Sequence, residues 1–163
     1  MPEKIQQWKQ QIEEHLAPFA HKIPYGNLRF AFTDALLGEA PATNLAMVYE
    51  VPGGSTNQIN VIARHDAEEF HYLSPDDHEE RITYDPEEVT GMLEQVARSV
   101  PELRRERLRE EIQRWFGEGR SRQEMFVEIN KLLQMDFKGG SITHHELKES
   151  INYILELGGA KEG

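Results

Sequence analysis

Between residues 28 and 84, apolar side chains recur at every second position, and this alternation limits the fold more than any other feature of the sequence. The segments LRFAFT and LAMVYEV, at residues 28–33 and 45–51, show it most clearly, and QINVIAR, EFHYL and RITY are shorter runs of the same kind. Such alternation is typical of β-strands with one buried face. Turn-rich segments, GEAPATN, PGGSTNQ, HDAEE and SPDDHEE, separate the runs. We therefore predict an antiparallel meander of four or five strands that ends near residue 84.

The segments on both sides of this region have helical periodicity. Residues 3–17 carry an apolar stripe with steps of three and four, and Pro18 marks its predicted end. After residue 84, four helix starts are predicted from their capping residues. These starts are Asp85, Ser99, Ser121 and Thr143. The predicted fold class is therefore α+β: an N-terminal helix, a four- to five-stranded antiparallel meander, then four C-terminal helices.

The length of the chain suits one domain or two very small ones. We predict a single α+β domain over residues 1–163, because a sheet with one apolar face needs a cover. A sub-boundary near residue 85 is the alternative. It would separate a helix-plus-sheet part, residues 1–85, from a helical part, residues 86–163.

The composition of the chain excludes several kinds of functional site and bears on its location in the cell. The chain has no cysteine, so disulfides, thiolate metal sites and cysteine nucleophiles are excluded. No stretch approaches the roughly 18 apolar residues of a membrane span, and the first ten residues do not resemble a signal peptide. We expect a cytoplasmic protein with no membrane contact.

The segment MDFKGGSITHHEL, residues 135–147, is similar to the second half of an EF-hand calcium loop. Gly140, Ile142 and Glu146 match the turn glycine, the hydrophobic eighth position and the bidentate twelfth position. The first, third and fifth positions, which normally supply side-chain oxygen to calcium, fall on Met135, Phe137 and Gly139. We therefore predict no calcium binding, and interpret Thr143 to Glu146 as a capping box.

Three histidines lie in an acidic stretch and raise the alternative of a metal site. His65, His71 and His78 stand among six aspartates and glutamates, and imidazole with carboxylate can bind zinc or manganese. Their spacing matches no common ligand motif. The interpretation we prefer is an acidic, solvated rim, and a metal-binding protein or metal-dependent enzyme stays the alternative.

An arginine-rich stretch stands out against the overall net charge of −11. Residues 98–122 hold eight arginines and five glutamates, and arginine replaces apolar residues at one end of the predicted buried stripe. Because arginine recognises flat carboxylate and phosphate groups, we predict a partner-binding surface here. It comprises Arg104, Arg105, Arg109, Trp115 and Phe116. RNA binding through this helix is a second alternative, although the negative charge of the rest of the chain argues against nucleic acid.

The sequence shows no complete catalytic set and no cofactor motif, so we predict no cofactor and lean against an enzyme. Our leading hypothesis is a small acidic protein-binding module of adaptor, assembly-factor or chaperone type, with another protein as its partner. A homodimer stays an open alternative.

Overall fold

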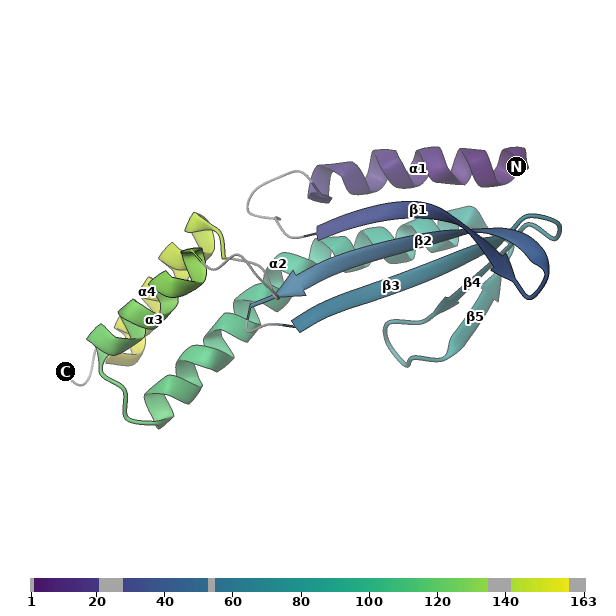
Figure 1. Ribbon diagram of the computed structural model, residues 1–163. Coiled ribbons are helices and arrows are strands. Elements are labelled where there is room, and N and C mark those ends of the chain that lie inside the picture. The colour runs from purple at the N-terminus through teal and green to yellow at the C-terminus, as the bar shows by residue number, and fades with distance from the viewer. Residues whose placement is uncertain (1, 21–27, 53–54, 135–141, 159–163) are drawn as a thin grey trace. The chain divides into compact units, whose positions relative to one another are not determined.

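The computed structural model describes residues 2–20, 28–52, 55–134 and 142–158, and it confirms the α+β class (Figure 1). An N-terminal helix precedes five strands, and three further helices follow. The elements are α1 (Glu3–Ala20), β1 (Leu28–Leu37), β2 (Ala40–Val51), β3 (Ser55–Arg64), β4 (Glu69–Leu73), β5 (Glu80–Thr83), α2 (Pro86–Gly117), α3 (Arg122–Gln134) and α4 (His144–Gly158). None of the helices in the described part of the chain combines the length and the apolar character that a membrane span requires.

The five strands form one sheet in the order β1-β2-β3-β4-β5, as the predicted meander requires. β1 and β2 pair antiparallel, with Leu37 opposite Ala40, so only Gly38 and Glu39 form the turn. Gly38 has a φ of 64°, which suits the first position of a two-residue hairpin turn. The sequence interpretation of residues 38–44 as a turn was therefore wrong beyond Glu39. Pro41 lies near the start of β2, where a proline is tolerated in a sheet.

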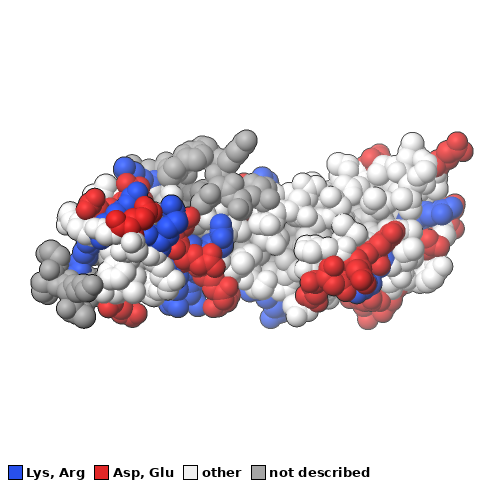
Figure 2. Space-filling model, turned by 90° about the horizontal axis from the view of Figure 1, so that it is seen from below, with Lys and Arg blue, Asp and Glu red and all other residues white. Residues whose placement is uncertain are grey.

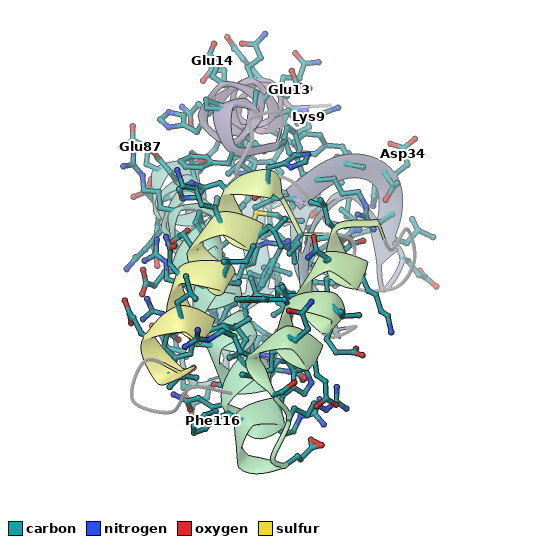
Figure 3. All side chains as sticks on the ribbon, turned by 90° about the vertical axis from the view of Figure 1, so that its left-hand side faces the viewer. Lys9, Glu13, Glu14, Asp34, Glu87 and Phe116 are labelled. Carbon is teal, nitrogen blue, oxygen red and sulfur yellow. The ribbon has the colours of Figure 1, made fainter. Side chains whose placement is uncertain are left out.

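One face of the sheet is covered by α1 and by the first part of α2. The stripe predicted for α1 is fully buried, and Trp8 at its centre lies against the rings of Phe32 and Phe70, with centroid distances of 5.7 and 5.0 Å. The opposite side of α1 carries Glu13 and Glu14, which point away from the sheet (Figure 3). This division between an apolar and a charged side is why residues 3–20 form a helix on the sheet.

Helix α2 begins as predicted and covers the same face. The backbone N–H of Glu87 donates to Asp85 Oδ1 at 3.0 Å, which is the expected N-cap contact. Val89 and Leu93 are buried, and the Oγ1 hydroxyl of Thr83 in β5 donates to Glu88 at 2.7 Å. The end of β5 is thus tied to the first turn of the helix that follows it.

The helix start predicted at Ser99 does not exist, because α2 continues through Pro101 to Gly117. The chain therefore has three helices after the sheet and not four. Six buried residues follow one another along α2 with steps of three or four: Leu93, Ala97, Val100, Arg104, Leu108 and Ile112. Burial of this continuous stripe offsets the loss of one backbone hydrogen bond at the proline.

The helix starts predicted at Ser121 and Thr143 are confirmed, and the end of α2 is capped as well. α2 ends in a Schellman motif, in which the N–H of Arg120 donates to the carbonyl of Trp115 at 3.2 Å and Gly119 has a φ of 84°. At the start of α3, Ser121 and Glu124 exchange backbone-to-side-chain hydrogen bonds of 3.1 and 3.2 Å. Thr143 and Glu146 form the same box before α4, at 2.9 and 3.1 Å.

The chain packs as two compact units that share α2. The first contains α1, the body of the sheet and α2 as far as Arg98. The second contains α2 from Ser99 onward, α3, α4 and Glu50 at the end of β2. In the second unit α3 and α4 lie side by side (Figure 3) and enclose a core with α2. The change between units falls inside a helix, thirteen residues after the alternative boundary near 85; whether the chain folds as one domain stays a prediction.

Candidate protein-binding surface

Arg104 does not lie on a surface, and this corrects the partner-binding set. Its side chain is 0% exposed, and Nε and Nη2 donate to the two carboxylate oxygens of Glu146 at 2.7 and 3.0 Å. Nη1 donates to the backbone carbonyl of Glu50. A guanidinium with a bidentate carboxylate and a carbonyl is well satisfied, so Arg104 joins α2 to α4 inside the second unit.

The other four residues of that set have mixed positions. Trp115 is buried in the core of the second unit, whereas Phe116 is partly exposed beside the end of α2 (Figure 3). Arg105 Nε lies 2.9 Å from Glu149, and Arg109 lies over the ring of Tyr153 at 5.0 Å. The structure therefore does not bring the five residues together as one exposed surface.

Most arginines of this stretch engage glutamates of their own unit. Arg107 pairs with Glu110 at 3.0 Å, and Arg114 pairs with Glu111 and Glu118. Exposed pairs at this spacing make a charge-balanced helix surface and stabilise it only slightly. The pairing weakens the argument for RNA binding through α2, which depended on arginines directed at a partner.

The three histidines of the metal alternative have separate neighbours. His65 is hydrogen-bonded to Thr43 at 2.8 Å, and His71 lies 3.0 Å from Glu69 on β4. His78 lies in the β4–β5 turn with a φ of 59°. Among the residues that the structure describes, no group of three or more histidines and acids is arranged to hold a metal ion. The segment 135–141 of the calcium-loop comparison lies outside the described residues, but Glu146, the twelfth position, binds Arg104 with both oxygens.

The first unit carries the unbalanced charge of the molecule. Residues 66–88, from the β3–β4 turn to the start of α2, contain ten aspartates and glutamates and one arginine. That arginine, Arg81, pairs with Asp77 at 2.6 Å and with Glu79 at 3.4 Å. Figure 2 shows a compact red group of acidic side chains at the part of the molecule labelled β4 and β5 in Figure 1.

Exposed apolar side chains lie within this acidic region. Phe70 and Tyr72 of β4 are buried under the helices, so the intervening residues point to the opposite side of the sheet. The register places His71 opposite Ile82 and Leu73 opposite Glu80. We call this surface the outer β4–β5 face, and it consists of Glu69, His71, Leu73, Glu80, Ile82 and Tyr84. Leu73, Ile82 and Tyr84 are 58%, 55% and 61% exposed.

The polar groups of the outer β4–β5 face are linked to one another. The Tyr84 hydroxyl donates to Glu69 Oε1 at 3.2 Å, and this hydrogen bond to a carboxylate raises the pKa of Tyr84. His71 lies between Glu69 and Glu80, with ring nitrogens 3.0 and 3.8 Å from their oxygens. None of the six residues is a serine, cysteine or lysine, so the imidazole has no nucleophile beside it within this set. The face offers carboxylate acceptors around apolar patches, which suits binding more than covalent chemistry.

The β4–β5 turn is held in one shape by its own hydrogen bonds. The N–H of Ser74 donates to the Glu79 carbonyl at 2.9 Å, and the N–H of His78 donates to the Ser74 carbonyl at 2.8 Å. The Asp77 carboxylate accepts from the N–H of Glu79 and from Arg81, and both contacts lower its pKa. These contacts fix the shape of the turn, and Arg81 offsets the charge of Asp77.

A hollow opens beside this turn at one end of the strands. Its volume is about 250 Å³, and its walls include Tyr49 of β2, residues 57–60 of β3 and Leu73 of β4, with the turn residues Ser74, Pro75 and His78. Burial raises the pKa of Tyr49 above its ordinary value. Comparison of the chain with protein-family models, with curated proteins and with solved structures gave no match.

The acidic segment could be identified from the sequence, but the outer β4–β5 face was not predicted from it. It described the histidine-containing segment as an acidic, solvated rim, and it expected the partner at the arginines of α2. The alternation of EFHYL contained a usable signal, because it places Leu73 on the side opposite to Phe70 and Tyr72. The hollow had no such signal, because its walls come from three strands and a turn that only the sheet brings together.

Proposed function

We propose that the chain is a protein-binding module whose outer β4–β5 face holds a positively charged, partly apolar segment of another protein. The observation that carries this proposal is the position of three apolar side chains, each more than half exposed, beside Glu69 and Glu80 on one face of β4 and β5. The surrounding segment, residues 66–88, holds ten acidic residues and one arginine. Charge complementarity would bring a basic segment to this face, and the apolar side chains would then be buried by it. Adaptors, assembly factors and chaperones hold partner segments in this way.

β5 supports the proposal because it is a short strand at the edge of the sheet. An edge strand has backbone groups on one side that no neighbouring strand pairs, and an extended segment can add there as a further strand. Acidic side chains beside such an edge would repel a second acidic copy and accept a basic segment.

The test uses a fluorescein-labelled dodecapeptide that alternates leucine with lysine and arginine, and the same peptide with glutamate at its basic positions. We expect the full-length protein to bind the first and not the second, as measured by fluorescence anisotropy. The variant Glu79→Lys with Glu80→Lys should weaken binding roughly tenfold or more, because two attractive charges become repulsive. Both side chains are largely exposed, so folding should be retained.

The matched control is Glu13→Lys with Glu14→Lys on the outer side of α1, which changes the net charge by the same amount. It should leave binding nearly unchanged. Equal loss in the two variants would show that only net charge matters, and failure of the basic peptide to bind would refute the proposal.

A further inference from the structure

β5 is the last strand of the sheet, so one side of its backbone is open to a further strand (Figure 1). In the described part of the chain its only strand neighbour is β4. Ile82 and Tyr84 are more than half exposed, and so is the side chain of Glu80. A segment of another protein can therefore reach this edge.

The hydrogen bonds of the β4–β5 hairpin decide which backbone groups of β5 face the open side. The N–H of Ser74 donates to the carbonyl of Glu79 at 2.9 Å, so the backbone groups of this pair point toward each other. The next pair in the register is Leu73 with Glu80. Residues that face each other alternate along an antiparallel ladder with residues that face away. The N–H and C=O groups of Glu80, and those of Ile82 two residues further on, therefore point to the open side.

The exposed side chains along this edge change character from one end of β5 to the other. Glu80 stands at the start of the strand, directly after the turn, and residues 76–79 add three acids of which Arg81 pairs with two. Ile82 and Tyr84 lie at the other end. A strand added to β5 would meet carboxylates at the start of β5 and apolar side chains at its end.

We propose that the bound segment adds to β5 as an antiparallel strand, with apolar residues first and lysine or arginine two to four positions later. This inference rests on the proposed function and specifies the order and direction of its ligand. An antiparallel strand runs against β5, so its residue opposite Ile82 precedes its residue opposite Glu80 by two positions. The strand pairs β1–β2, β3–β4 and β4–β5 are all antiparallel, and this ladder is slightly more stable than a parallel one.

The same two residues of the segment would make both kinds of contact. Their backbone groups exchange hydrogen bonds with Glu80 and Ile82, and strand alternation places their side chains on the outer β4–β5 face. The first side chain then packs beside Ile82, and the second pairs with the Glu80 carboxylate across the strands. The residue between them has its N–H directed away from β5.

The first experiment separates strand addition from attraction to a charged surface. It uses a fluorescein-labelled heptapeptide with leucine, threonine, leucine, threonine, lysine, threonine and lysine in that order, and a second heptapeptide of reversed order with the same composition and charge. We expect the full-length protein to bind the first at least about fivefold more tightly in fluorescence anisotropy, because only this order matches both ends of β5 in an antiparallel strand.

N-methylation of the first heptapeptide tests the backbone contacts. A methyl group on the nitrogen of the second leucine should weaken binding about tenfold or more, because that N–H faces β5 and donates to it. A methyl group on the nitrogen of the following threonine should change the affinity little, because that N–H points away.

The matching change in the protein is Ile82→Pro, with Ile82→Ala as its control. Proline removes an N–H that faces the open side and none that pairs with β4, and edge positions of this kind tolerate proline. Alanine shortens the same side chain but keeps the N–H. We expect Ile82→Pro to bind the first heptapeptide at least about fivefold more weakly than Ile82→Ala. Thermal unfolding shows whether each variant is folded, and the methylated peptides decide the question if Ile82→Pro is not.

The outcomes separate this inference from the proposed function. Equal weakening by the two methyl groups refutes strand addition, and equal affinity for the two orders refutes the direction. Either result leaves the acidic surface standing if the basic dodecapeptide binds, whereas failure of the dodecapeptide and both heptapeptides overturns the proposed function as well. A dimer of the wild type that dissociates in Ile82→Pro would identify a second copy as the occupant of this edge and refute the inference.

Discussion

At the scale of single residues, Arg104 is the side chain whose environment most affects stability. Among the described residues it is the only fully buried arginine, and its charge is satisfied by Glu146 and by the Glu50 carbonyl. The sequence showed that an arginine interrupts the apolar stripe of α2. It did not show the partner, because Glu146 lies forty-two residues further along the chain. Glu146 itself was predicted only as a capping residue, and the structure shows that it caps α4 and also pairs with Arg104.

Removal of one member of this pair is expected to destabilise the protein strongly. Arg104→Leu leaves the Glu146 carboxylate buried without its partner, and such changes cost about 3–5 kcal/mol. Arg107→Leu, which removes an exposed pair with Glu110, should cost less than about 1 kcal/mol. Urea unfolding monitored by circular dichroism measures both. The double variant Arg104→Leu with Glu146→Gln should be more stable than Arg104→Leu alone, and a double variant that is less stable would contradict a buried ion pair.

At the scale of elements, three of the four helix starts predicted after the sheet are confirmed, and the start predicted at Ser99 is wrong. One physical reason explains both results. The boxes at Ser121 and Thr143 are confirmed, since each lies directly before the first residue of a helix. The same pattern at Ser99 lies inside α2, where the buried stripe runs on without a break. A capping pattern supplies side chains that can cap a helix. Packing of the apolar residues decides whether a helix begins at that position.

The box at Ser121 predicts a pH dependence of stability. The backbone N–H and the hydroxyl of Ser121 lower the pKa of Glu124, so the carboxylate stabilises the folded state above the pKa of the unfolded chain, about 4.3. That contribution is lost as pH falls through the lower folded pKa. Glu124→Gln should therefore be less stable than the wild type near pH 7 and should approach it near about pH 3 in urea unfolding. Glu156→Gln, an exposed position on α4, is the control and should show no such convergence.

At the scale of the whole molecule, the two units differ in how far their charged side chains are paired with opposite charges. In the second unit the arginines of α2 are balanced by glutamates of the same unit, whereas in the first unit the acids around β4 and β5 have few basic partners. The sequence predicted the sheet, its order along the chain and the acidic segment. Two of the five predicted partner-binding residues, Arg104 and Trp115, are buried, because a count of arginines does not reveal which of them already have internal partners.

Added salt should weaken binding of the basic peptide much more than it changes the stability of the fold. Raising the salt concentration from about 0.1 M to about 1 M shortens the Debye length from about 10 Å to about 3 Å, which screens exposed charges and affects buried pairs much less. We expect the affinity for the basic dodecapeptide to fall at least about tenfold over this range. The urea midpoint of unfolding should change little by comparison. An affinity that is insensitive to salt would mean that the apolar side chains alone hold the peptide.

The double role of Glu146 has a consequence for how α4 forms. A helix is slow to nucleate because its first turn gains few contacts for the order it requires, and its ends fray. In α4 the first turn is closed by Glu146, and the same carboxylate carries the contact with α2 through Arg104. We therefore expect formation of the first turn of α4 and its docking on α2 to be coupled, because one carboxylate makes both contacts.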